Sequence, residues 1–265
     1  MNGRRRFPKT FCTTLLTSAL FAACASEPST SANEPTPPVT SVASEVTTGT
    51  PVTASAIVTA EPSASATTTA TASVEPPVAD PGPLPKGLRV LVIGDSFAQA
   101  LGAGMKRREA AFGGRAILRG EKATFIPEWA GPNKGVAGMM IQEKPDLVVI
   151  ALGGNELAMV TPEIRAPKVQ ELVKLIGGKP CVWVLPPLWG DKKDNGLLKV
   201  IKENSAPCRL YDSNVLSADL PRGSDKIHPT FEGQAKWADE VLEWARKERD
   251  TAASAFALKA RPTTE

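Results

Sequence analysis

The chain has 265 residues and a formal net charge of +3 at pH 7, with one histidine and four cysteines. Four basic residues lie in residues 1–23, six acidic residues lie in 24–80, and residues 81–265 therefore carry +5. This balance excludes the strongly basic surface that nucleic-acid binding requires, so we expect no nucleic-acid partner. A single histidine and no C-x-x-C pair exclude a zinc site of histidine and cysteine, and we expect no metal or cofactor.

Residues 1–23 have the composition of an export signal. Three consecutive arginines begin at Arg4, and the apolar stretch from Phe11 to Ala23 is too short to span a membrane. Leu20-Phe21-Ala22-Ala23-Cys24 resembles a bacterial lipobox, which implies acylation of Cys24. We expect an exported protein, lipid-anchored in the bacterial cell envelope (periplasm or cell surface), with no other membrane contact. The alternative is cleavage at the A-x-A-like site Ala23–Ala25 and secretion.

Residues 24–86 are rich in Ser, Thr, Ala, Pro and Val and show no helical or strand periodicity. Such a segment buries too little apolar surface to offset the entropy lost on ordering, so we predict a disordered linker. As a flexible coil it would span roughly 40–50 Å. The linker would hold the following domain away from a membrane surface.

Apolar runs alternate with helical patterns over residues 87–248, and a loose tail is predicted over 249–265. The predicted strands are Leu88–Ile93, Ala123–Ile126, Asp146–Leu152, Cys181–Leu185 and Arg209–Asp212. The predicted helices are Phe97–Phe112, Lys134–Glu143, Thr161–Ile176, Leu197–Lys202 and Thr230–Lys247. This alternation predicts a doubly wound, flavodoxin-like α/β sandwich of three layers around a five-stranded parallel sheet.

Polar clusters follow the predicted strands where each of them ends. They are Gly94-Asp95-Ser96, Trp129-Ala130-Gly131, Gly153-Gly154-Asn155-Glu156, Pro186-Pro187-Leu188-Trp189 and, after a loop, Asp225 and His228. Because the carboxyl ends of parallel strands share one edge of the sheet, we expect a binding site there.

Serine, histidine and aspartate in this arrangement indicate nucleophilic catalysis. Ser96 is the candidate nucleophile, His228 the base and Asp225, three residues earlier, the group that orients the imidazole. Donors for an oxyanion come from Asn155 and from the backbone of Ser96 and Gly131.

These residues resemble the motif blocks of the SGNH/GDSL hydrolases. The blocks are Gly94-Asp95-Ser96-Phe97, a central glycine, Gly153-Gly154-Asn155 and Asp225-Lys226-Ile227-His228. The resemblance spans Leu88–Trp244 and implies the roles just given, with Phe97 standing where the best-known members carry Leu. Gly131, Gly135 and Gly138 compete for the central position. We prefer Gly131 because it follows the second predicted strand.

The resemblance and the export signal predict a serine esterase that removes a small acyl group, with acetyl the leading candidate. The expected substrate is a cell-envelope saccharide or a related small ester. The alternatives are a lysophospholipase or thioesterase, an acyl transferase, and an envelope binding or assembly module that retains the fold without hydrolysis. The oligomeric state stays open.

The remaining cysteine pair, Cys181 and Cys208, lies inside the domain at the start of two predicted strands. In an exported protein such a pair is a disulfide candidate. In a flavodoxin-like order the two strands are neighbours, so the two Cα atoms should lie within about 7 Å.

Overall fold

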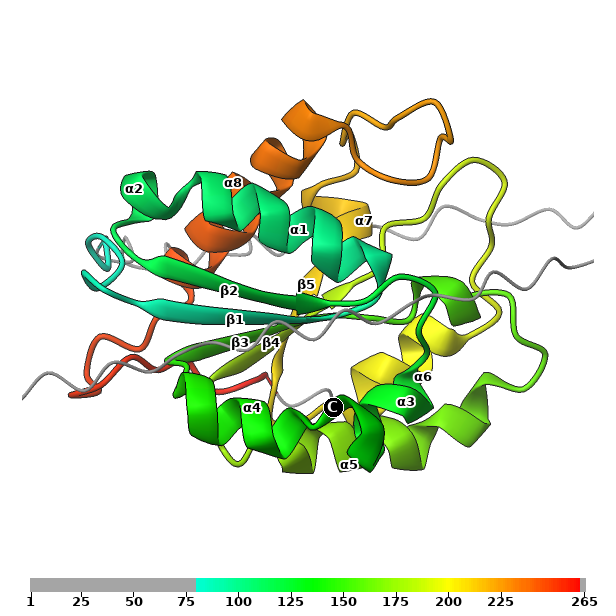
Figure 1. Cartoon of the computed structure of the whole chain (residues 1–265), viewed down its shortest axis with the longest axis horizontal. Helices are drawn as coiled ribbons and strands as arrows, with labels where there is room; N and C mark the ends of the chain where they lie inside the picture. Colours follow the sequence, from blue (N-terminus) through cyan, green and yellow to red (C-terminus); the bar gives the residue numbers. More distant parts are fainter. Residues whose placement is uncertain (1–79, 263–265) are drawn as a thin grey trace, which may run out of the picture. The chain divides into compact units, whose positions relative to one another are not determined.

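A computed structural model describes residues 80–262. The signal segment, Cys24 and nearly all of the linker lie outside the described residues. All strands pair in parallel in one sheet of order β2-β1-β3-β4-β5, which confirms the predicted flavodoxin-like fold class (Figure 1). The strands are β1 (Arg89–Gly94), β2 (Arg115–Gly120), β3 (Leu147–Ala151), β4 (Cys181–Leu185) and β5 (Arg209–Asp212).

Helices cover both faces of the sheet, which gives three layers (Figure 1). One face carries α1 (Ser96–Arg107), α2 (Glu109–Phe112) and α8 (Phe231–Lys247). The other carries α3 (Ile126–Ala130), α4 (Val136–Glu143), α5 (Ala166–Leu175) and α6 (Leu197–Asn204). The short α7 (Ser213–Leu216) follows β5 directly, and 3-10 turns occupy Pro132–Lys134, Gly154–Glu156 and Pro162–Arg165.

The alternation of side chains along each strand divides the core into two halves. Val90 and Val92 of β1 pack towards α1 and α8, whereas Leu91 and Ile93 pack towards the helices of the opposite face. All five residues of β3 are buried. A central strand that is apolar on both sides is what a parallel sheet covered on both faces requires.

The second strand was predicted in the wrong place. The structure has β2 at Arg115–Gly120, and the predicted strand Ala123–Ile126 is instead a loop that enters α3. Arg115 and Arg119 flank an apolar run of only three residues in β2, which lies at the edge of the sheet and is only partly buried. The run 123–126 buries Ile126 as the first residue of a helix, with Pro127 next, so its apolar character does not reflect a strand.

The predicted helices are all present, and two of them are interrupted. The first breaks at Arg108 between α1 and α2 and ends at the left-handed Gly113. The helix predicted from Thr161 begins as a 3-10 turn and becomes α-helical at Ala166, where Pro167 cannot donate a backbone hydrogen bond. Thr230 caps α8 by accepting from the backbone N–H of Gly233 at 3.0 Å.

The chain on both sides of the predicted domain contacts the core. Before residue 87, Leu84 is buried, and Arg249 donates to the carbonyl of Pro83 at 2.6 Å. After α8, Phe256 and Leu258 pack against the core, and Arg209 donates to the carbonyl of Ala260 at 2.9 Å. The segment from 249 to 262 is thus held against the domain, in contrast to the loose tail expected from its sequence.

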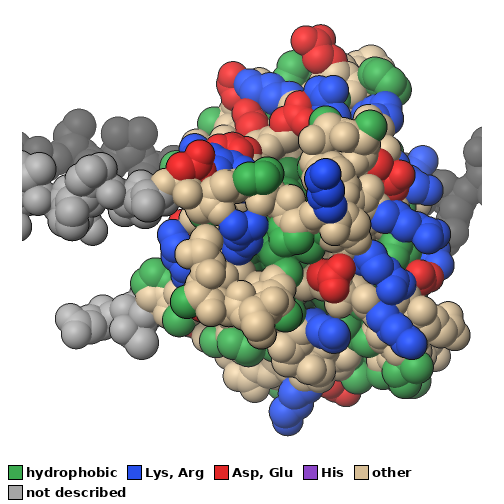
Figure 2. Space-filling model, turned by 90° about the vertical axis from the view of Figure 1, so that its left-hand side faces the viewer, with side chains coloured by type: hydrophobic (Ala, Val, Ile, Leu, Met, Phe, Trp, Pro, Cys, Tyr) green, Lys and Arg blue, Asp and Glu red, His purple; other side chains and the backbone are tan. Residues whose placement is uncertain are grey.

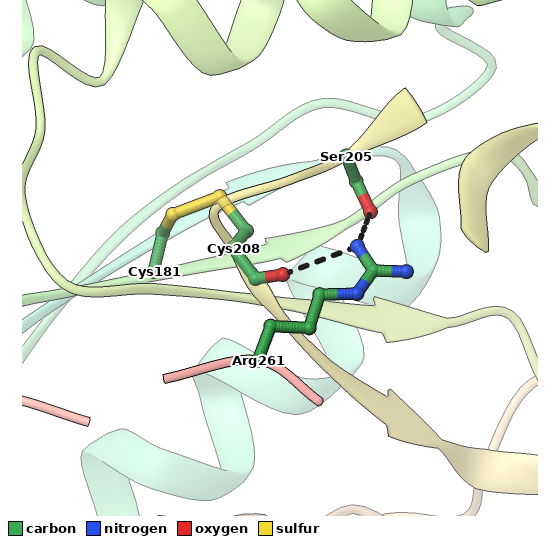
Figure 3. Close-up of a disulfide and its surroundings, with 4 residues drawn as sticks. All are labelled: Cys181, Ser205, Cys208 and Arg261. Atoms are coloured by element: carbon green, nitrogen blue, oxygen red, sulfur yellow. Dashed lines mark hydrogen bonds between the residues drawn. A yellow bond between two sulfur atoms is a disulfide. The ribbon is translucent and has the colours of Figure 1, made fainter. Parts of the chain in front are cut away.

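A disulfide joins Cys181 of β4 to Cys208, which lies immediately before β5, with 4.7 Å between the Cα atoms. Arg261 crosses over this edge and donates to the Ser205 hydroxyl at 3.1 Å and the Cys208 carbonyl at 3.5 Å (Figure 3). Closing a loop with a sequence separation of 27 stabilises the folded chain by about 3 kcal/mol.

The surface towards the amino ends of the strands has mixed charge. Lysine, arginine and acidic side chains intermingle there with small hydrophobic areas (Figure 2). Among the described helices, none has the length and apolar character needed to cross a bilayer.

Candidate functional site

The turn from β1 into α1 positions Ser96. Gly94 has a φ of +134°, and a Cβ there would lie 2.0 Å from the Ala151 carbonyl oxygen, so only glycine fits this close approach of β1 and β3. Ser96 follows as the first residue of α1, with a half-buried side chain. Its backbone N–H has no partner within the helix, because the first four N–H groups of any helix lack one.

Asp95 fixes this turn from within the core. Its fully buried carboxylate accepts from the backbone N–H of Phe97 at 2.9 Å, of Gly153 at 3.1 Å and of Gly154 at 3.0 Å. Burial raises the pKa of Asp95 to about 6, although the three donors act in the opposite direction. Asp95 thereby ties the serine turn to the loop that carries Asn155.

The loop before α8 brings the histidine to the serine. His228 Nε2 lies 2.8 Å from Ser96 Oγ, and His228 Nδ1 lies 2.7 Å from Asp225 Oδ2. The other carboxylate oxygen, Oδ1, accepts from the backbone N–H of Ile227 at 2.9 Å and of His228 at 3.0 Å. One aspartate therefore shapes the turn and contacts the imidazole, so three predicted residues meet across a sequence separation of 132.

The electrostatics of the two aspartates differ. Asp225 has a half-exposed side chain, and its pKa falls to about 2 because its hydrogen bond to His228 and two backbone donors favour the carboxylate. It is therefore ionised at any pH near neutrality, which suits a group that accepts from an imidazole N–H.

Asn155 is held by the loop that follows β2. Its Nδ2 donates to the carbonyl of Thr124 at 3.0 Å, which leaves the second amide hydrogen for another acceptor. The adjacent Glu156 is buried, accepts from the backbone N–H of Ile126 at 2.8 Å and pairs with Arg165. These bonds join the β3 loop to the loop after β2, so Glu156 is a positioning residue that sequence reasoning left without a role.

Gly131, the preferred oxyanion glycine, does not fit that role. Its backbone N–H donates to the Pro127 carbonyl at 3.0 Å, where it ends α3. Gly135 is likewise engaged, with the Pro132 carbonyl at 3.0 Å, whereas Gly138 lies in the first turn of α4, where backbone N–H groups have no partner within the helix. The choice of Gly131 depended on a second strand at 123–126, whereas β2 ends at Gly120. Ser96 and Asn155 stay the predicted oxyanion donors.

A cavity of about 500 Å³ lies beside the serine and the histidine. Its lining consists of Ser96, Gln99, Ala100, Lys122, Asp225, His228 and Gln234. Gln99 lies one helical turn from Ser96, a spacing that the sequence alone could have indicated. Lys122 can be assigned to the cavity only when the position of β2 is known, and Gln234 only when the packing of α8 on α1 is known. Within residues 80–262, no cluster of three or more His, Cys, Asp and Glu side chains forms a metal site.

Phe97 packs beside the imidazole of His228 and beside Trp189. The ring of Phe97 lies 5.6 Å from that of His228 and 5.6 Å from that of Trp189, between centroids. Trp189 is half-buried and packs on the core. Trp129, also expected near the site, is buried and donates through Nε1 to the Thr124 hydroxyl at 2.9 Å. Both tryptophans therefore pack in or against the core.

Comparisons with known proteins give structural matches only. No protein-family model and no curated protein matches the sequence. The structure is similar to the lipase/acylhydrolase from Enterococcus faecalis, at 18% identity over 66% of this chain and 100% of that one (TM-score 0.48). It is also similar to Est24, a carbohydrate acetylesterase from Sinorhizobium meliloti, at 18% identity over 59% and 97% (TM-score 0.46). A third similar structure is the periplasmic domain of a lipopolysaccharide acetyltransferase from Salmonella ser. Paratyphi A, at 12% identity over 60% and 83% (TM-score 0.43).

Proposed function

We propose that this protein is a serine ester hydrolase of the SGNH/GDSL type. The observation that carries the proposal is the unbroken chain of contacts from Ser96 Oγ to His228 Nε2 and from His228 Nδ1 to Asp225. A hydroxyl, an imidazole and a carboxylate in hydrogen-bond contact form a unit that converts serine into a nucleophile.

In the proposed reaction, Ser96 Oγ attacks the ester carbonyl carbon while His228 Nε2 takes the hydroxyl proton. Asp225 accepts from Nδ1–H, which keeps Nε2 free to receive that proton. The oxyanion accepts from the Ser96 backbone N–H and from the second amide hydrogen of Asn155, at the positive end of α1. His228 then gives its proton to the departing alcohol, and water hydrolyses the acyl-serine by the same steps.

The lining of the cavity favours a small acyl group on a hydrophilic alcohol. Ala100 supplies the one apolar side chain among the cavity residues, beside two glutamines and Lys122. A long fatty chain needs an apolar lining, which disfavours the lysophospholipase alternative. We therefore retain an acetylated saccharide of the cell envelope as the proposed substrate, with an acyl transferase as the closest alternative.

A fluorophosphonate probe tests the proposed function directly. The wild type should be labelled at Ser96, Ser96→Ala should not be labelled, and p-nitrophenyl acetate should be hydrolysed faster than longer p-nitrophenyl esters. Ser224→Ala provides a matched control, because this exposed serine lies in the Asp225 loop. Folded wild type that resists labelling would favour the binding or assembly module. Transfer of acetyl to a sugar acceptor, instead of release as acetate, would identify a transferase.

The proposed location is the bacterial cell envelope, with Cys24 as the point of lipid attachment. Two acyl chains suffice for stable membrane anchoring, so a lipidated Cys24 would hold the domain at the end of its linker. Cys24→Ala should move the protein from the membrane fraction to the soluble fraction. A wild-type protein that is already soluble, with cleavage beyond Cys24, would rule out the anchor.

A further inference from the structure

Gln234 connects the candidate cavity to a second group of residues at the far end of α1. Gln234 lines the cavity, and its side-chain Oε1 accepts from Arg107 Nη2 at 3.0 Å. Ser96 and Arg107 are the first and last residues of α1, so the two ends lie about 16 Å apart along the helix axis. A ligand that extends from Ser96 past Gln234 therefore reaches Arg107.

Arg107 meets an exposed aromatic ring at that point. Its guanidinium carbon lies 3.9 Å from the ring centroid of Phe231, and its Nη2 also donates to the Phe231 carbonyl at 3.1 Å. The Phe231 side chain is 71% exposed although it begins α8, whose other large apolar residues face the core. We call this pair the Arg107–Phe231 platform.

The platform presents two chemistries that suit a sugar ring. The exposed part of the phenyl ring offers a surface to the C–H groups of a pyranose, and the guanidinium offers planar donors to hydroxyl or carboxylate oxygens. Salt bridges within the described residues do not include Arg107, so its charge is not neutralised by a nearby carboxylate of that region. The Arg107 hydrogen bonds fix the guanidinium over the ring, so little ordering is needed on binding.

We propose that the Arg107–Phe231 platform binds a sugar unit of a polysaccharide whose acylated unit lies at Ser96. This inference rests on the proposed function and specifies its substrate: a chain that follows α1, several units long, instead of an isolated small ester. The chain would pass Gln99 and Gln234, whose amides line the intervening cavity. Binding energy from the platform would then lower KM for the polymer and leave small esters unaffected.

The test compares Phe231→Ala with the wild type on two kinds of ligand. One is p-nitrophenyl acetate, which reaches Ser96 alone, and the other is a panel of purified peptidoglycan and O-acetylated acidic and neutral polysaccharides. We expect wild type to bind at least one polymer, and Phe231→Ala to weaken that binding about tenfold, which is the size of one aromatic contact. Phe231→Ala should hydrolyse p-nitrophenyl acetate at nearly the wild-type rate, because this ester does not reach the platform. Arg107→Gln should act in the same direction, through KM and not kcat.

Ile141→Ala is the matched control, because Ile141 is 74% exposed on α4, on the opposite face of the sheet. It should change neither polymer binding nor ester hydrolysis. Wild type that binds no polymer of the panel, or Phe231→Ala that binds as wild type does, would overturn the inference. Polymer binding by wild type that depends on Phe231 but comes without any ester hydrolysis would instead overturn the proposed function and leave the platform standing.

Discussion

The two halves of the candidate site are built differently. The serine half lies between β1 and β3, where buried Asp95 holds Gly153 and Gly154 by their backbone N–H groups. The histidine half is a loop on the surface, where Asp225 holds its own turn and the imidazole. The sheet therefore fixes the position of Ser96, whereas the half-exposed carboxylate of Asp225 fixes the position of His228. Substitution of Asp95, the buried support of the first half, should therefore affect folding, whereas substitutions in the second half should affect catalysis alone.

The largest expected effect is that of His228→Ala. Activity on p-nitrophenyl acetate should fall by about 10⁴-fold, and Ser96→Ala should fall equally, because either change disables the same unit. Since His228 lies in a surface loop, the free energy of unfolding of His228→Ala should differ from that of the wild type by less than about 0.5 kcal/mol. Steady-state kinetics with urea denaturation measures both quantities. Near wild-type esterase activity in folded His228→Ala would falsify the mechanism.

Asp225→Asn should cost about 10²–10³-fold in kcat. Asparagine presents an N–H to Nδ1, which favours the imidazole tautomer that cannot accept the serine proton. The expected loss is smaller than for His228→Ala because the Asp225 side chain is half exposed and water can replace it. The pKa of Asp225 is about 2, so its ionisation should not limit the wild-type rate above about pH 4. Wild-type kcat in Asp225→Asn would show that the local turn, and not the carboxylate charge, positions the imidazole.

Asn155→Ala should lower kcat by about 10²-fold and leave KM nearly unchanged. The amide hydrogen acts on an oxyanion that exists only in the transition state, so its loss does not weaken substrate binding. Thr124→Val is a useful comparison, because it removes the hydroxyl that accepts from Trp129 and keeps the backbone carbonyl that accepts from Asn155 Nδ2. A change in KM alone, measured with p-nitrophenyl acetate, would place Asn155 in substrate binding instead.

Asp95 should have the smallest effect on chemistry and a distinct effect on stability. Its folded-state pKa of about 6 exceeds the unfolded value, so the folded chain binds more protons between roughly pH 4 and 6. The resulting stabilisation is complete below about pH 4 and is lost as pH rises through 6, by roughly 2–3 kcal/mol. Asp95→Asn cannot titrate and should lack this slope. Parallel pH dependence of the unfolding free energy in the two proteins would contradict the burial argument.

The same carboxylate complicates the acid side of a rate profile. Asp95 titrates close to pH 6 and binds the two glycines before Asn155. Protonation of Asp95 is therefore one source of a fall in activity on acidification. Comparing the profile of wild type with that of Asp95→Asn isolates this contribution.

The sequence alone determined the class of the fold, and it indicated the candidate residues Ser96, Asp225 and His228 that the structure brings into contact. Runs such as Asp146–Leu152 are apolar on both faces, which fits only a strand covered on both sides, and turn residues after each run mark the edge where function collects. The same reasoning indicated Ser96, Asp225, His228 and Asn155, because each belongs to a short motif whose chemistry is local. It failed for β2, an edge strand whose short apolar run is flanked by arginines, and the choice of Gly131 failed with it.

Only the tertiary structure decided what those residues contact. The burial of Asp95, the bond of Glu156 to the backbone of Ile126 and the packing of α8 on α1 all join segments distant in the chain. Gln234 and Lys122 line the cavity for the same reason, and no local pattern encodes such neighbours. Hydrophobic periodicity reports which face of an element is buried, but it does not report which residue of another element lies opposite. That pairing depends on how the helices cross the sheet, and it therefore appears only in three dimensions.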